Sequence, residues 1–501
     1  MLFNSYTFIA FFILLLLLHN KTSLPWHVKK FNLLLGSYIF YAAWNPPFII
    51  LLWISTAIDF IIGKKLFAED NKTRRKVLLL ISLVGNLGML GYFKYGGFLL
   101  ENFTIAMNAM GIDYHAAQPD IILPVGISFY TFQTLSYTLD MYYRKSEPEK
   151  SLLDFSLFVT FLPQLVAGPI VRPNQLIPQF KKPHTANGQQ LATGLFLLTL
   201  GLFMKVGLAD SMLSKSADSV FGATNHVGSL DAWLGVLAFS GQIFFDFGGY
   251  STCAIGIAYC LGFSLPDNFR YPYGAIGFSD FWRRWHITLS TWLRDYLYIP
   301  LGGNRRGELR TYTNLMTTML LGGLWHGASW TFVVWGGLHG TYLCIERLLK
   351  TKKSPTDHSA TEQLNPMTPP EGMVTATASL APAFFRKKSV QNFFAALLTF
   401  FLVNITWVFF RAQDFPTAGR LLESMFGLVK NGSAILTNLA IIKVSIVISG
   451  MVLTHWFMRN TSVLKVAQHL KWWVISIVWA AMLIFLLLTQ ESSSSFIYFQ
   501  F

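Results

Sequence analysis

Two histidines have the clearest capacity for chemistry in this sequence. His326 lies in "GGLWHGASW" (Gly322–Trp330), within the stretch Thr311–Ile345, which contains no Asp, Glu, Lys or Arg. His286 lies in the aromatic segment "FWRRWHITLSTW" (Phe281–Trp292). Burial in an apolar site disfavours the charged form of an imidazole and leaves the ring able to accept a proton. A general base of this kind typically contributes about 10²–10⁴-fold to a rate.

We interpret His326 as a candidate general base. Removing the proton from an acceptor hydroxyl, so that the hydroxyl attacks a thioester, needs a group of this kind. Two histidines from adjacent elements could face one tunnel, and His286 is the second. The alternatives stay open at this point: His326 could be a packing histidine bonded to a backbone carbonyl, and His286 could orient His326 or cap a neighbour. His339, in "WGGLHG", is expected to be a buried histidine with satisfied hydrogen bonds.

The element that carries His326 must be interrupted. As one straight helix, Thr311–Ile345 would be about 52 Å long, whereas the hydrocarbon core of a bilayer is about 30 Å thick. His326 is therefore expected near a break, where backbone polarity is tolerated only against protein or a water-filled cavity. The expected break or close-packing points are the glycines at 322, 323, 327, 336, 337 and 340.

The element that carries His286 is expected to be one helix in Gly277–Gly307. Ser279 is a suitable N-cap, Asp280 can pair with Arg284, and Pro300 ends the helix after about 19 residues, or about 28 Å. Its charged residues would cost on the order of 10 kcal/mol at the bilayer centre. We therefore predict an interfacial or re-entrant helix packed inside the protein near the cytosolic face. Its basic side chains suit an anionic partner, such as the phosphates of a nucleotide-like carrier.

The composition is that of a membrane protein. Of the 501 residues, 53% are hydrophobic and 13% charged, and soluble domains carry about 25% charged residues. We count roughly eleven or twelve hydrophobic segments, which excludes a soluble globular protein. Charge-free runs include Met1–Asn20, Phe31–Ile58, Gln189–Met204, Ser389–Phe410, Val444–Met458 and Trp472–Gln490.

The net charge of +14 is explained by the excess of Lys and Arg in cytoplasmic loops, and nucleic acid is not expected as a partner. We expect Met1–Asn20 to be an uncleaved membrane helix rather than a cleaved signal peptide. If Phe31–Gly63 is two helices bent at Asn45–Pro47, the N-terminus lies outside. The loops expected on the cytoplasmic side are Lys64–Lys76, Arg270–Arg284, Gly302–Arg310, Lys350–Lys353 and Arg386–Lys388.

The chain is expected to form one membrane domain, residues 1–501. A cytoplasmic linker rich in Pro, Ser and Thr, Thr351–Ser389, separates the block 1–350, which holds both histidine motifs, from the helices of 390–501. The three cysteines, Cys253, Cys260 and Cys344, are interpreted as packing residues, and no metal-binding spacing is present.

The two histidine motifs together resemble the membrane-bound O-acyltransferase (MBOAT) family. The branch that looks most similar is that of bacterial alginate O-acetyltransferases, with its AlgI-like and peptidoglycan-acetylating PatA-like members and D-alanyl-transferring relatives. The other segments that carry the resemblance are "ILPVGISFYTFQTLSYTLDMYY" (Ile122–Tyr143), "FLPQLVAGPIVRP" (Phe161–Pro173), "QIFFDFGGYSTCAIG" (Gln242–Gly256), "WVFFRA" (Trp407–Ala412) and the ending "SSFIYFQF".

The resemblance implies an all-α polytopic fold of about 11–12 transmembrane or re-entrant helices in a ring around a central tunnel. It implies that His326 is the catalytic histidine and His286 the second active-site histidine. It also implies a multi-pass protein of the bacterial inner membrane, with acetyl-CoA or another acyl thioester as donor substrate and no bound cofactor. The implied partners are an extracytoplasmic polysaccharide acceptor, membrane lipid, and a periplasmic acetyl-carrying or SGNH-type acetyltransferase.

Further polar residues are candidates for the substrate-binding site. For several the alternative is structural: Arg294 and Asp295 could neutralise one another, and Asp246 could belong to a structural network. Asp59, a second intramembrane carboxylate, is expected to pair with Lys64 or Lys65 at a helix end. The substrate-binding candidates are Trp325, Arg284, Arg294, Asp295, Asn304, Arg306 and Asp246.

Three functions compete. The leading hypothesis is transfer of an acetyl group from a cytosolic thioester to hydroxyls of an extracytoplasmic polysaccharide such as alginate. The second is the same chemistry with another acceptor: acetylation of peptidoglycan, or D-alanyl transfer to teichoic acid. The third is a transporter whose intramembrane histidines and acids relay ions, although a relay would not need the paired histidine motifs.

Overall fold

The computed structural model describes residues 3–21, 23–117, 119–351, 387–489 and 496–497. In these ranges the chain is helical and forms no β-strand beyond one isolated bridge, between Val227 and Ser433. The predicted linker Thr351–Ser389 falls almost entirely outside the described residues. The α-helices are α1 (Tyr6–Asn20), α2 (Trp26–Ala42), α3 (Ile49–Ala68), α4 (Lys72–Leu90), α5 (Gly96–Ala109), α6 (Ile127–Tyr142), α7 (Leu152–Thr160), α8 (Leu162–Leu165), α9 (Pro173–Lys181), α10 (Gly188–Leu202), α11 (Lys215–Phe221), α12 (Ser229–Cys260), α13 (Phe278–Trp282), α14 (Ile287–Leu293), α15 (Glu308–His326), α16 (Trp330–Thr351), α17 (Lys387–Arg411), α18 (Phe415–Met425), α19 (Asn438–Met458), α20 (Val463–His469) and α21 (Trp472–Thr489). Two 3₁₀ turns, η1 (Pro46–Phe48) and η4 (Pro272–Gly274), and three π-helical segments, η2 (Gly91–Tyr95), η3 (Phe203–Ser214) and η5 (Arg294–Tyr298), complete the set.

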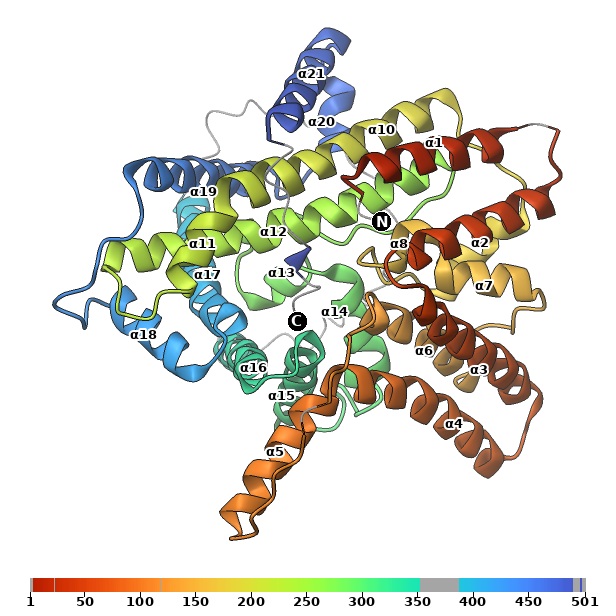
Figure 1. Ribbon diagram of the computed structural model, residues 1–501, viewed down its shortest axis with the longest axis horizontal. Helices are drawn as coiled ribbons and strands as arrows, with labels where there is room; N and C mark the ends of the chain where they lie inside the picture. The colour runs from red at the N-terminus through yellow and green to blue at the C-terminus, as the bar shows by residue number, and fades with distance from the viewer. Residues whose placement is uncertain (1–2, 22, 118, 352–386, 490–495, 498–501) are drawn as a thin grey trace.

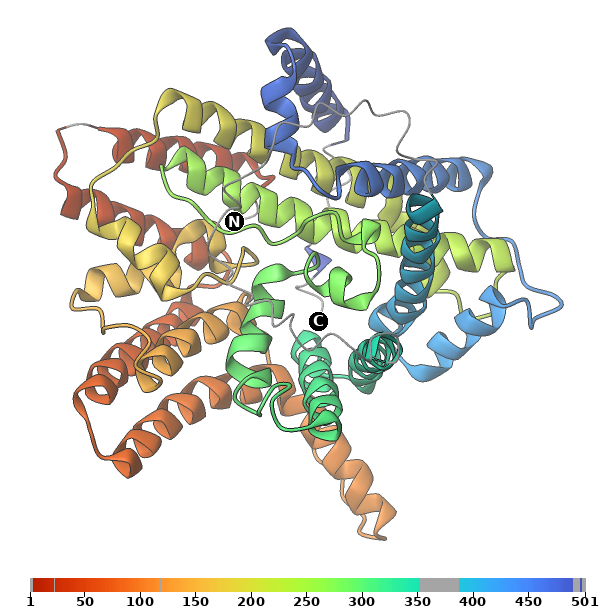
Figure 2. The same cartoon turned by 180° about the vertical axis from the view of Figure 1, so that it is seen from behind.

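The short helices α13 and α14 lie in the middle of the molecule, and longer helices surround them (Figures 1 and 2). The long helix α12 passes on one side of them and the pair α15–α16 lies on the other (Figure 1). The histidine motifs are therefore carried by the central elements and their inner neighbours, and the surrounding helices shield them.

The fold is that of an all-α polytopic membrane protein, as expected. Within the described ranges, 7 helical segments are long and apolar enough to cross a membrane. Phe31–Gly63 is indeed two helices, because α2 ends at Ala42 and the 3₁₀ turn Pro46–Phe48 precedes α3. The candidate spans are Pro46–Ala68, Lys72–Ala109, Gly188–Phe221, Ser229–Cys260, Val390–Arg411, Asn438–Met458 and Trp472–Thr489.

Contacts connect the elements that flank three of the basic loops, and we call this part of the molecule the basic end. The guanidinium of Arg75 donates hydrogen bonds to main-chain carbonyls at the end of α6. In the last turn of α6, Asp140 accepts a hydrogen bond from the Tyr296 hydroxyl of η5 at 2.8 Å. Glu346, near the end of α16, accepts hydrogen bonds from the first backbone N–H groups of α13. This grouping is what the positive-inside interpretation requires. The loops are Lys64–Lys76, Arg270–Arg284 and Gly302–Arg310.

The prediction of one continuous helix in Gly277–Gly307 is wrong, because the segment is divided into α13, α14 and η5. The N-cap is Gly277, with φ +84°, rather than Ser279, since the Glu346 carboxylate binds the N–H groups of Phe278 and Ser279 from outside. His286, with φ +41°, interrupts the helix. The predicted pair of Asp280 and Arg284 does form, at 2.8 Å.

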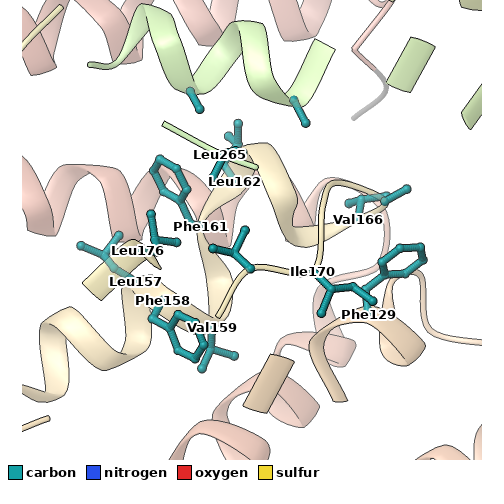
Figure 3. Packing of buried hydrophobic residues seen from close by; sticks show 14 of the residues in the cluster. Phe129, Leu157, Phe158, Val159, Phe161, Leu162, Val166, Ile170, Leu176 and Leu265 are labelled. Carbon is teal, nitrogen blue, oxygen red and sulfur yellow. The ribbon is translucent and has the colours of Figure 1, made fainter. Parts of the chain in front are cut away.

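A buried apolar cluster holds the centre of the segment "FLPQLVAGPIVRP" in place (Figure 3). Phe161, Leu162 and Ile170 are buried in it. The backbone N–H of Ile170 also donates a 3.0 Å hydrogen bond to the hydroxyl of Thr288, two residues after His286. This contact ties the first turn of α14 to the rigid core.

Helices α15 and α16 touch through glycines, as the sequence predicts. A Cβ at Gly336 would lie 2.3 Å from the carbonyl oxygen of Met319, whereas a Cβ at Gly337 would meet only the Leu320 side chain, at 3.5 Å. Small residues of this kind let two helix backbones approach closely.

We expect Gly336→Ala to destabilise the protein by about 1–3 kcal/mol, because the added methyl group meets backbone that cannot move aside. The matched change Gly337→Ala should have little effect, since its methyl group makes an ordinary contact. Melting of the detergent-solubilised protein, followed by size-exclusion chromatography, measures both variants. Equal Tm values for the two would contradict the close packing.

Candidate active site

His326 is the last residue of α15, at the predicted break. Its side chain is buried, and its ring lies 5.0 Å from the Trp325 ring and 5.0 Å from the Trp335 ring, centroid to centroid. Gly327 ends the helix, and a Cβ there would lie 2.1 Å from the Phe332 ring. A glycine is therefore needed at position 327, because any side chain there would collide with Phe332 of α16.

His286 is the N-cap of α14 and adopts a left-handed backbone conformation, φ +41° and ψ +55°. This conformation is uncommon for a residue other than glycine, and such strain is concentrated at functional sites. The ring is completely buried against Phe247, at 4.7 Å between centroids, and Trp325, at 5.9 Å. This backbone conformation at His286 separates α13 from α14, and the His286 ring lies in the core.

Asn268 sets the tautomer of His286. Its Oδ1 accepts a hydrogen bond from the backbone N–H of Thr288 at 3.3 Å, and its Nδ2 donates to Ser251 at 3.1 Å. A backbone N–H can only donate, so the atom facing His286 is the amide oxygen, which can only accept. His286 Nδ1, at 3.1 Å from this oxygen, must then carry the proton. The other ring nitrogen, Nε2, is left basic, and it has no hydrogen-bond partner among the described residues.

The two imidazoles lie together. Their ring centroids are 6.4 Å apart, and the Trp325 ring contacts both. A pocket adjoins His326, and Trp325, Ser128 and Lys94 also line it. The arrangement places two buried imidazoles together, and one of them, His326, lines a pocket that has Trp325 and Phe129 in its wall. Such a site can accept a proton from a bound hydroxyl.

The other substrate-binding candidates do not line this pocket. Arg284 binds Asp280, which also pairs with Arg459. Asp295 pairs with its neighbour Arg294 at 2.8 Å and with Arg172 at 3.2 Å, so the structural alternative for this pair has geometric support. Asn304 and Arg306 are exposed in the loop before α15. Of the nominated residues, the structure brings together His326, His286 and Trp325.

Asp246 belongs to a buried ion cluster. Its carboxylate pairs with Lys205, which also binds Asp210 at 2.9 Å. The other Asp246 oxygen accepts a 2.7 Å hydrogen bond from the backbone N–H of Ile497, close to the end of the chain. These contacts support the interpretation of Asp246 as a member of a structural network, because its carboxylate holds the backbone of Ile497 in the core.

The prediction for Asp59 is wrong. Its carboxylate is fully buried and accepts hydrogen bonds from Ser82, Asn86 and Thr138, not from the lysines at the end of α3. Asp59 lies more than one turn before Lys64 and faces the interior between α3, α4 and α6, whereas Lys64 lies at the helix end. The prediction for His339 is confirmed for its burial but not for its hydrogen bonds: Nε2 lies 3.0 Å from the Thr406 hydroxyl, whereas Nδ1 has no hydrogen-bond partner among the described residues.

Two residues at the site were missed. Lys94 lines the pocket and was detectable, because it is the single charged residue between Lys76 and Glu101. Asn268 has no comparable signal, since it stands in a loop 18 residues before His286. Across the described ranges, no group of three His, Cys, Asp or Glu side chains is placed to bind a metal ion.

Comparisons with known proteins agree on one family. Residues 146–356, which include both histidines, match the model of the MBOAT, membrane-bound O-acyltransferase family. The chain is 40% identical over 400 residues to the "Probable alginate O-acetylase AlgI" of Pseudomonas aeruginosa, covering 79% of this chain and 70% of that protein. It is 34% identical over 519 residues to the "Peptidoglycan O-acetyltransferase" of Helicobacter pylori, covering 94% and 91%. Against the "Teichoic acid D-alanyltransferase" of Bacillus subtilis the identity is 26% over 239 residues, covering 46% and 60%.

Proposed function

The chain belongs to the membrane-bound O-acyltransferase family and is an O-acyltransferase, and from this premise we propose that it transfers acetyl groups to an extracytoplasmic polysaccharide such as alginate. The donor is a cytosolic thioester, acetyl-CoA, and the protein resides in the bacterial inner membrane. The observation that carries the proposal is the pairing of His326 with His286 beside the pocket.

In the proposed reaction, His326 accepts the proton of the attacking hydroxyl. The hydroxyl oxygen bonds to the thioester carbonyl carbon, and the carbon–sulfur bond then breaks. The thiolate leaves and takes up the proton that the imidazole holds. His286 assists through its basic Nε2, and Asn268 keeps that nitrogen unprotonated by accepting the hydrogen bond from Nδ1.

We further propose that the acetyl group is handed on outside the membrane. The donor approaches from the basic end, because its phosphates suit the lysines and arginines gathered there. In cells, a periplasmic acetyl-carrying partner of the SGNH type receives the group on a hydroxyl and passes it to the polysaccharide. With the purified protein, the hydroxyl of an added oligosaccharide takes the place of the partner. The seven candidate spans support a protein that bridges the two compartments.

Peptidoglycan is the second candidate acceptor. The peptidoglycan O-acetyltransferase of Helicobacter pylori aligns over 94% of this chain and 91% of its own length, a wider match than the alginate O-acetylase gives. D-Alanyl transfer has weaker support, because the identity to the teichoic acid D-alanyltransferase of Bacillus subtilis is 26%, against 34% for the peptidoglycan O-acetyltransferase and 40% for the alginate O-acetylase.

The experiment is consumption of thioester by the purified protein in lipid nanodiscs. We expect the protein to release free thiol from acetyl-CoA in the presence of a hydroxyl acceptor, such as oligomannuronate or a peptidoglycan fragment, and to form an acetyl ester on one of them. When D-alanyl carrier protein replaces acetyl-CoA as the donor, we expect no release of free thiol. Solute transport without thioester consumption would instead establish a transporter and contradict the proposal.

A further inference from the structure

A lysine is built into the wall of the pocket beside His326. Lys94 lies in the π-helical segment η2, between α4 and α5, within the candidate span Lys72–Ala109. π-Helical turns inside α-helices are rare and occur frequently at functional sites. A lysine within an apolar helical segment is expensive, and intramembrane ionisable residues are functional candidates by default. Neither the histidine motifs nor the proposed reaction accounts for Lys94.

The contacts of Lys94 show what it does to α15. Its Nζ donates hydrogen bonds to the carbonyl oxygens of Trp325, at 2.8 Å, and His326, at 2.9 Å. These are the last two carbonyls of α15, which have no partner within the helix and carry the negative end of its dipole. The Lys94 side chain, which comes from the segment between α4 and α5, thereby caps the last turn of α15, the turn that carries His326.

Lys94 has no acidic partner among the described residues. Beyond the two carbonyls, its Nζ lies 3.5 Å from the Ser128 hydroxyl and 5.8 Å from the centre of the Trp325 ring, and no described carboxylate forms an ion pair with it. Lys94, Ser128 and His326 line the same pocket. The pocket wall therefore presents the amine of Lys94 close to His326 and without an acidic partner among the described residues.

We propose that Lys94 is a positioning residue for His326 and supplies the positive charge of the pocket wall. This inference rests on the proposed acyl transfer at His326. By holding the two terminal carbonyls, Lys94 fixes the final turn of α15 and with it the imidazole. When the acceptor oxygen bonds to the thioester carbon, the carbonyl electron pair moves onto its oxygen, and the nearby ammonium stabilises that charge.

The test compares Lys94→Met, Lys94→Arg and Tyr95→Phe in nanodiscs. Tyr95 is the matched control, because its hydroxyl also donates a hydrogen bond to α15, to Leu324 at 2.8 Å, but carries no charge. We expect Lys94→Met to lower kcat for thiol release from acetyl-CoA by about 10–100-fold with an unchanged KM, as a small misplacement of a catalytic group does. Lys94→Arg should recover most of the loss, and Tyr95→Phe should lose less than about 3-fold.

A second measurement separates failure of this inference from failure of the proposed function. Hydrogen exchange of the peptide that contains Leu324–Gly327 should be faster in Lys94→Met than in the wild type or Tyr95→Phe, whether or not acetyl-CoA is a substrate. Unchanged exchange in Lys94→Met, or an unchanged kcat in an active preparation, overturns the role of Lys94. A wild type that is inactive on acetyl-CoA but shows the exchange difference overturns only the proposed donor.

Discussion

Replacing His326 with glutamine is expected to lower the rate of acetyl transfer by about 10²–10⁴-fold, the contribution typical of a general base. Glutamine keeps much of the volume of the ring but cannot take up a proton at neutral pH. The loss should appear as free thiol no longer released from acetyl-CoA, with the amount of membrane-inserted protein and its Tm close to those of the wild type.

His339→Gln is the matched control for this experiment. His339 is also a buried histidine among aromatic rings, 4.8 Å from Trp335 between centroids, but it contacts Thr406 and does not line the pocket. It should retain activity within a few-fold. Equal activity of the wild type and His326→Gln would remove His326 from the reaction, and equal losses in both variants would show that the loss comes from packing.

The second large loss, about 10²-fold in kcat, is expected for Asn268→Leu. Leucine has a similar size but removes the oxygen that accepts the proton of His286 Nδ1, so the imidazole is free to adopt the other tautomer. Rates of acetyl-ester formation with saturating acetyl-CoA measure this effect. The expected loss in kcat is large because the buried His286 ring has no other hydrogen-bond partner among the described residues on either nitrogen.

Ser251→Ala provides the comparison. Ser251 bonds only the Nδ2 side of Asn268, so its loss leaves the oxygen and the His286 tautomer in place. We expect a change in kcat of less than about 3-fold. If Ser251→Ala and Asn268→Leu have the same activity, Asn268 supports the loop rather than the imidazole.

The sequence predicts the position of His326 because two local requirements agree there. A 35-residue apolar stretch is too long for one span, and glycines mark where its backbone can turn. The structure accordingly ends α15 at His326 and packs α15 against α16 through Gly323 and Gly336. The length of the apolar stretch and the positions of its glycines were sufficient for this part of the fold.

The break at His286 could not be predicted from local signals. Ser279, Asp280 and Arg284 are the right residues to begin one helix, but Glu346 caps the segment from α16, and packing holds His286 at positive φ. Asp59 shows the same limit: Lys64 and Lys65 are close in the sequence, yet the hydrogen-bond partners of Asp59 come from α4 and α6. Contacts between distant segments decide both cases.

The most direct test is the content of ester-linked acetyl groups on cell-surface polysaccharides, measured by mass spectrometry. Three kinds of cell are compared: those that produce this chain, those that lack it, and those that produce the His326→Gln form at the same membrane level. We expect the acetyl esters to be present in the first and absent from the other two. Acetylation that persists in cells with the His326→Gln protein alone would contradict a reaction centred on His326.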